Sequence, residues 1–107
     1  MNHPITITVS ASGEFTYAPT HVRASPNDTI DFQYLNAAGN PGIFEVMFKH
    51  ESPGNKMHIR HNSPKNQGGH HLQCKNNTGF FPYAAAVFDG AQVFVDVGCG
   101  DISVEDP

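Results

Sequence analysis

The sequence predicts an all-β protein, an antiparallel Greek-key β-sandwich of seven to nine short strands. Three observations predict this fold. Apolar and polar residues alternate in several short stretches, as they do in a strand with one buried face. Turn residues separate these stretches at intervals of about ten residues. The composition is rich in Phe, Gly and Pro and lacks Trp, and no stretch shows helical periodicity of useful length.

The first half of the chain holds the clearest strand patterns. Apolar residues alternate with polar ones at residues 5–9, 15–17, 30–35 and 44–48, which predicts a strand in each segment. Residues 36–42 combine Asn, Gly and Pro, which favour turns over regular structure. We therefore expect a loop between the third and fourth of these strands.

The second half begins with a different composition. Residues 50–71 contain five of the seven histidines and few apolar side chains, and we interpret them as one long polar, His-rich loop. Loops longer than about 12–15 residues are usually functional or disordered. After a turn at residues 76–79, the pattern predicts a long strand through Tyr83, Ala85 and Val87. It predicts further strands at residues 93–97 and 102–104, with Asp89-Gly90 as a hairpin turn.

The chain is expected to form a single domain over residues 1–107, because 11.6 kDa is within the usual size of one domain. Neither predicted sheet can hide its apolar face alone, so the two faces should pack together. The predicted core comprises eight inward-facing side chains: Phe15, Tyr17, Ile30, Phe32, Phe44, Val46, Tyr83 and Val87.

Charge is distributed unevenly along the chain. The net charge is −4, yet every basic residue except Arg23 falls within residues 49–75, and acidic residues dominate on both sides. This basic stretch is either a solvated loop or a patch for an anionic partner. Nucleic acid is not expected as a partner because the pI is only about 5.9, well below that of typical nucleic-acid-binding domains. No apolar run approaches the ~20 residues of a membrane-spanning helix.

Cys74 and Cys99 could form one disulfide in an oxidising compartment, or remain two reduced thiols in a reducing one. The compartment depends on how the chain is made. We expect a cytoplasmic protein if Met1 is native, and a periplasmic or extracellular one if a leader was removed.

Several motifs carry a resemblance to a known family. The first half contains ITITV at 5–9, G-x-F-x-Y-x-P at 13–19, NDTI-x-F at 27–32, and Asn36. The second half contains GFFPY at residues 79–83 and ends with ISV at 102–104. This arrangement resembles small bacterial cupredoxin-like domains over nearly the whole chain apart from residues 50–71, which implies a cupredoxin-type sandwich.

The same resemblance implies where a blue-copper site would lie. The family binds copper with two His, one Cys and a weak axial Met. Gly42 stands at the place of the first His, Cys74 at that of the Cys, and Asn77 at that of the second His, and no Met follows. The resemblance therefore implies a sandwich that lacks the blue-copper ligands and needs no cofactor.

The histidines allow an alternative. His58, His61, His70 and His71 could supply imidazole nitrogens to copper or zinc. The competing interpretation is that they are surface histidines without a native metal, since their Gly, Asn and Pro neighbours do not favour a helix that would align His58 with His61.

We expect a non-catalytic binding or assembly module of unknown partner, with a copper- or zinc-binding carrier protein as the alternative. An enzyme is not expected, because the sequence lacks the common nucleophile, metalloprotease and phosphate-binding motifs. The predicted partner surface is the His-rich loop, facing another protein or an anionic ligand. Self-association through exposed strand edges is a further alternative.

Overall fold

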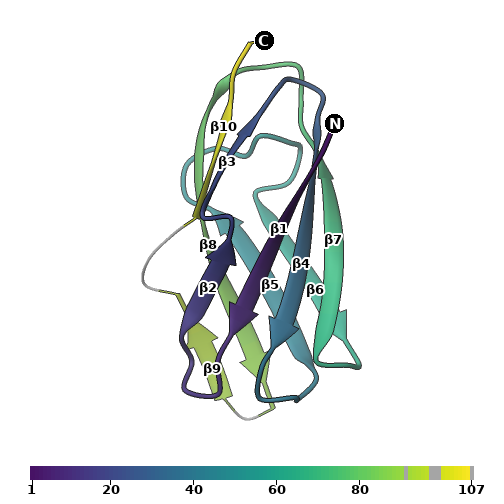
Figure 1. The fold of residues 1–107 in the computed structure, drawn as a ribbon, viewed down its shortest axis with the longest axis vertical. Coiled ribbons are helices and arrows are strands. Elements are labelled where there is room, and N and C mark those ends of the chain that lie inside the picture. The colour runs from purple at the N-terminus through teal and green to yellow at the C-terminus, as the bar shows by residue number, and fades with distance from the viewer. Residues whose placement is uncertain (91, 97–99, 107) are drawn as a thin grey trace.

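Ten β-strands form two stacked sheets in the computed structural model, which describes residues 1–90, 92–96 and 100–106. Those residues include no helix, and so none that could span a membrane. The chain repeatedly crosses from one sheet to the other along its length (Figure 1).

The smaller sheet has four strands in the order β2-β1-β4-β7. They are β1 (Asn2–Val9), β2 (Phe15–Ala18), β4 (Thr29–Asn36) and β7 (Gln67–Gln73). β1 and β4 run parallel, whereas β1–β2 and β4–β7 are antiparallel. β7 is an edge strand of this sheet, and it faces the viewer together with β1 and β4 in Figure 1.

The larger sheet has six strands, with the order β3-β10-β8-β5-β6 and with β9 paired to β8. They are β3 (His21–Ala24), β5 (Gly42–Phe48), β6 (His58–Ser63), β8 (Gly79–Asp89), β9 (Gln92–Val95) and β10 (Gly100–Val104). The long strand β8 is central. It pairs with β5 on one side, and with β10 and then β9 on the other.

The structure confirms the predicted β-sandwich but corrects two of its details. The sheets are mixed rather than antiparallel, because β1–β4 and β3–β10 are parallel pairs. The described residues also contain ten strands rather than seven to nine. Alternation identifies the buried side of a strand, but it carries no information about the direction of the neighbouring strand, so the parallel pairs could not be predicted.

Aromatic rings from both sheets meet in the core. The Tyr83 ring makes edge contacts with Phe32 and Phe48 at centroid distances of 5.5 and 5.9 Å. Six of the eight predicted core residues are buried. The other two, Phe15 and Tyr17, are half-buried and pack against the core from β2, at the edge of its sheet.

The prediction of one long loop at residues 50–71 is wrong. This segment contains the whole of β6 and most of β7. Ile59 and Leu72 are buried and anchor the two strands. The other inward positions hold His61, Ser63 and small or polar residues of β7 instead of apolar side chains. Apolar alternation was therefore too weak to reveal either strand.

Candidate functional site

The four histidines predicted as metal ligands lie on β6 and β7, which are edge strands of opposite sheets. Successive side chains of a strand point to opposite faces. His61 and His70 are half-buried at inward-facing positions, whereas His58 and His71 are exposed at outward-facing ones. The four side chains therefore do not converge on one point.

Each outward histidine faces a carboxylate of the neighbouring strand. His58 Nε2 lies 3.4 Å from Glu45 Oε1, and His71 Nδ1 lies 3.6 Å from Asp31 Oδ1. Both contacts become ion pairs when the imidazole is protonated. The exposed pairs are weak contributors to stability at neutral pH.

The inward histidines are held by packing. The His61 ring stacks on Tyr34 with a centroid distance of 6.1 Å and an interplanar angle of 25°. It also lies against Gly68, where an added Cβ would come within 2.5 Å of His61 Nε2. A side chain at residue 68 would therefore have to displace the His61 imidazole.

His70 is in an environment that disfavours its charged form. Partial burial lowers the pKa of its imidazole, and the positive charges of Lys56, His61 and His71 lower it further. The neutral form of His70 is therefore favoured. A neutral imidazole can bind a metal, but no group of three or more His, Cys, Asp or Glu suited to a metal occurs within residues 1–90, 92–96 and 100–106.

The positions aligned with blue-copper ligands are also separated. Gly42 pairs with Ser63, whose hydroxyl donates to the carbonyl of Gln67 at the start of β7. Cys74 follows the other end of β7. At about 3.4 Å per strand residue, Gly42 and Cys74 are on the order of 20 Å apart along the sandwich. The residues at these positions do not fit a blue-copper centre.

Cys74 is buried, and burial raises the pKa of its thiol to about 11, with a smaller contribution from the charge of Asp28. A thiol of this kind is a poor nucleophile at neutral pH. Its predicted disulfide partner, Cys99, lies outside the described residues.

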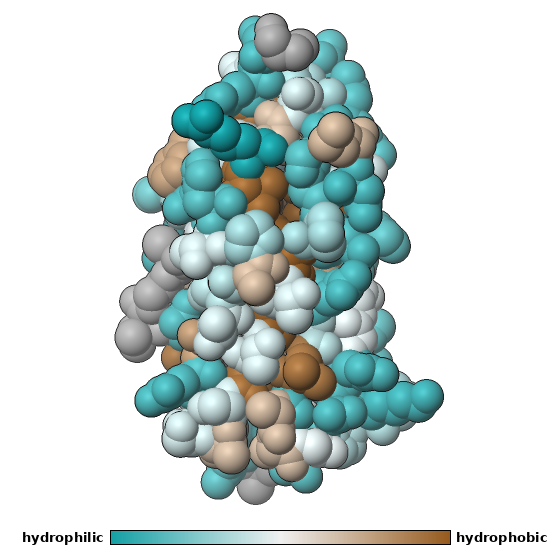
Figure 2. All heavy atoms as spheres, viewed as in Figure 1, coloured by the Kyte–Doolittle hydropathy of each residue, from teal (hydrophilic) through white to brown (hydrophobic). Residues whose placement is uncertain are grey.

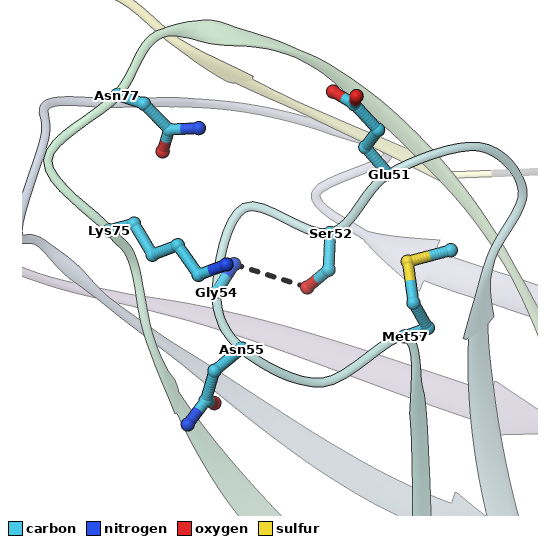
Figure 3. Close-up of a pocket in the computed structure, with 7 residues that line it drawn as sticks. All are labelled: Glu51, Ser52, Gly54, Asn55, Met57, Lys75 and Asn77. Carbon is cyan, nitrogen blue, oxygen red and sulfur yellow. Dashed lines mark hydrogen bonds between the residues drawn. The ribbon is translucent and has the colours of Figure 1, made fainter.

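A shallow polar pocket of about 300 Å³ lies between the loop before β6 and the segment after β7 (Figure 3). Lys75 reaches toward Ser52 and Gly54, and the Gly54 amide donates a 3.1 Å hydrogen bond to Ser52 Oγ. The described lining residues are Glu51, Ser52, Gly54, Asn55, Met57, Lys75 and Asn77. Neither a histidine nor a cysteine is among these described lining residues.

A more distinctive surface is the outer face of the six-stranded sheet. Phe88 of β8 lies in register between Ile43 of β5 and Val93 of β9. One step along the sheet, Ala86 lies beside Val95. Phe88, Val93 and Val95 are 47%, 58% and 57% exposed. We call these five side chains the apolar face.

The apolar face is slightly hollowed and has a charged border. A depression of about 180 Å³ is lined by Ile43, Glu45, Arg60, Ala86, Val87, Phe88 and Val93. Glu45 Oε1 lies 3.7 Å from Arg60 Nε, so the apolar centre is bordered by opposite charges. An apolar centre with a polar rim is the usual composition of a protein–protein interface.

Sequence reasoning missed this face, although the sequence carries its signal. Residues 80–88 are apolar at every position, whereas a strand with one solvated face should alternate. A continuous apolar run is typical of a strand covered on both sides.

A scan against protein-family models and a search of curated proteins found no match for this chain. Among solved structures, it is similar to a chain from a cryo-EM structure of a heme-copper terminal oxidase dimer, with a TM-score of 0.55 and 14% identity. The match covers 97% of this chain and 64% of the other, so this chain spans less than two thirds of its neighbour's length. The similarity shows the fold, and the all-β sandwich is compatible with a cupredoxin-like fold.

Proposed function

We propose that this domain is a non-catalytic, cupredoxin-like binding or assembly module without blue-copper ligands, and that a partner protein covers the apolar face. The observation that carries this proposal is the composition of β8. Its inward side chains fill the core, and its outward side chains are also apolar. Apolar side chains exposed to water have an unfavourable hydration free energy. A partner that covered the outward side of β8 would remove this cost.

The expected gain from covering this face is substantial. Phe88, Val93 and Val95 are each about half exposed. Since full burial of one such side chain contributes about 1.5–3 kcal/mol, completing the burial of all three would contribute about 2–5 kcal/mol. This gain would favour a partner that covers the face.

The opposite face of the sandwich provides a contrast. The outward residues of the four-stranded sheet include Thr6, Thr8 and Gln33, and the face shown in Figure 2 is mostly hydrophilic or intermediate in hydropathy. Ordinary solvation explains that face. The six-stranded sheet therefore provides the preferred partner surface.

The solved-structure neighbour gives further support. It belongs to a terminal oxidase dimer, so a similar sandwich occurs within a multi-chain protein. We infer from this an assembly role for the present chain, without assigning it the neighbour's activity.

The test compares two double variants by recovery of bound protein from the native source. Phe88→Ser with Val93→Ser removes the apolar face, and Thr6→Ser with Gln33→Ser alters the polar face as a matched control. We expect a partner to co-purify with the unmodified chain and with the control, and to be lost from the apolar-face variant. Retention of the same partner by all three proteins would contradict the proposal.

A further inference from the structure

The outer side of β8 is apolar along the whole strand. Its five outward residues are Phe80, Pro82, Ala84, Ala86 and Phe88, and we call them the β8 stripe. Phe80 is 62% exposed. A large aromatic ring therefore stands at each end of the stripe, and smaller residues lie between the two rings. The stripe continues the apolar face along the strand as far as Phe80.

Most of the exposed large apolar side chains lie on this side of the sandwich. The described residues include seven of them, and five are on the outer side of the six-stranded sheet, namely Met47, Phe80, Phe88, Val93 and Val95. Viewed onto its sheets, the molecule measures 42 by 24 Å (Figure 1). A face of this size has an area of about 1,000 Å², whereas each partner contributes only ~800 Å² to a standard interface. The face is therefore large enough for a stable dimer.

The β8 stripe carries both a projection and a hollow. The projection is Phe80 at one end, and the hollow is the depression of about 180 Å³ at the other end, beside Phe88. Eight residues of strand separate the two rings by on the order of 27 Å, and Ala84 lies midway. A two-fold axis across the stripe at Ala84 would place Phe80 of each copy over the depression of the other copy. The shape of this face is thus self-complementary.

The charges on the neighbouring strand fit the same axis. Met47 of β5 lies beside Ala84. The Lys49 amide donates a 3.1 Å hydrogen bond to the Pro82 carbonyl, which continues the β5–β8 pairing past the end of β5. Glu45 and Lys49 therefore lie on the outer side of the sheet, at equal distances from Met47 and on either side of it. The two-fold axis brings Glu45 of one copy over Lys49 of the other, and symmetry repeats this opposite-charge pair.

We propose that the partner covering the apolar face is a second copy of this chain, and that the two copies form a closed two-fold dimer through their six-stranded sheets. This inference rests on the proposed function, because it names the partner for the same surface. The small side chain of Ala84 lets the two sheets approach closely at the axis, and Phe80 fills the depression of the opposite copy. Because the same face is buried in both copies, assembly stops at the dimer.

The first experiment measures the mass of the purified chain by sedimentation equilibrium in a reducing buffer, at about 1 µM to about 300 µM. We expect a reversible monomer–dimer equilibrium. Phe80→Ser should weaken dimerisation by at least about tenfold, because each dimer loses two buried rings. Met57→Ser is the matched control. Met57 is 45% exposed but lines the polar pocket, so this variant should dimerise like the unmodified chain.

Two charge variants test the position of the axis. Lys49→Glu and Glu45→Lys should each weaken self-association by at least about fivefold, because like charges then oppose each other across the interface. An equimolar mixture of the two variants should form a mixed dimer, since opposite charges face each other again. A mixture that stays monomeric would overturn the proposed dimer. Self-association of either variant at the strength of the unmodified chain would overturn it as well.

Failure of this inference can be distinguished from failure of the proposed function. The chain could be monomeric at every concentration and still recover a different protein from the native source through the apolar face. That result would overturn the dimer and support the binding module. A monomeric chain that recovers no partner at all would overturn both.

Discussion

The buried side-chain amide of Asn36 donates a 2.9 Å hydrogen bond to the carboxylate of Asp89, 53 residues away. Asn36 ends β4, and Asp89 ends β8, so this contact joins the two sheets at one end of the sandwich. Asn36 Oδ1 also accepts a 3.0 Å bond from the Ala38 amide. The Asn36 side chain thus links the two sheets and also holds the loop that follows β4.

Replacing Asn36 with Ala should destabilise the fold by about 1–3 kcal/mol, because the Asp89 carboxylate and the Ala38 amide would lose a partner. The free energy of unfolding in urea measures this change. The control is Asn40→Ala, which removes an exposed 3.3 Å bond to the same carboxylate and should cost less than about 0.5 kcal/mol. Equal effects of the two variants would contradict the role given to Asn36.

The unfolding free energy should also depend on pH through His70. Its pKa is lowered in the folded state, so the unfolded chain binds the proton more readily. This contribution is present above the unfolded pKa of about 6.5 and is lost as the pH falls from there through the folded pKa. His70→Gln should reduce the slope of stability between about pH 7 and pH 5 relative to His50→Gln. An unchanged slope of the unfolding free energy against pH would show that His70 does not cause this dependence.

Asp28 should act at lower pH. The hydrogen bond from His3, followed by that from the Ser25 amide, lowers the pKa of its carboxyl. Its stabilising contribution is present above the unfolded pKa of about 3.9 and is lost as the pH falls through the lower folded value. His3→Gln should raise the pKa of Asp28 in an NMR titration. A pKa at or above the ordinary value in the unmodified chain would contradict this account.

Much of the sandwich could be predicted, because apolar and polar residues alternate along a strand that buries only one face. Ile30, Phe32 and Tyr34 are buried as their alternation indicates. β6 and β7 escaped prediction because their inward positions include His61 and His70, which pack at an open edge without apolar alternation.

The candidate surfaces were harder to predict than the fold. The spacing of His58, His61, His70 and His71 allows a cluster only if residues 50–71 form one long loop. Once the segment forms two edge strands, the period of two sends these side chains to different faces. The match of Cys74 to a copper ligand likewise rests on the order of motifs along the sequence. Sequence order does not reveal that Gly42 and Cys74 lie near opposite ends of the sandwich.

The Cys74 thiol should react slowly in the folded protein. With a pKa of about 11, only about one thiol in a thousand would be ionised at pH 8. In a Cys99→Ser background, we expect slow modification by a thiol reagent in buffer and rapid modification in denaturant. Equal rates under the two conditions would show that the thiol is accessible and activated.

Addition of Cu(II) should produce no intense absorption band at about 600 nm. A blue-copper centre requires two imidazoles and a thiolate that converge on one copper ion. Visible spectroscopy of the reduced chain tests this expectation, and a parallel calorimetric titration tests the metal-carrier alternative. An intense band would show that the ligands do converge.

The most direct test of the central claim is site-specific photo-crosslinking from the apolar face in the native source. A photoreactive residue at Val93 should yield one discrete crosslinked partner, and the same residue at Gln33, on the polar face, should not. Crosslinks from Gln33 but none from Val93 would contradict the assignment of the six-stranded sheet as the partner surface.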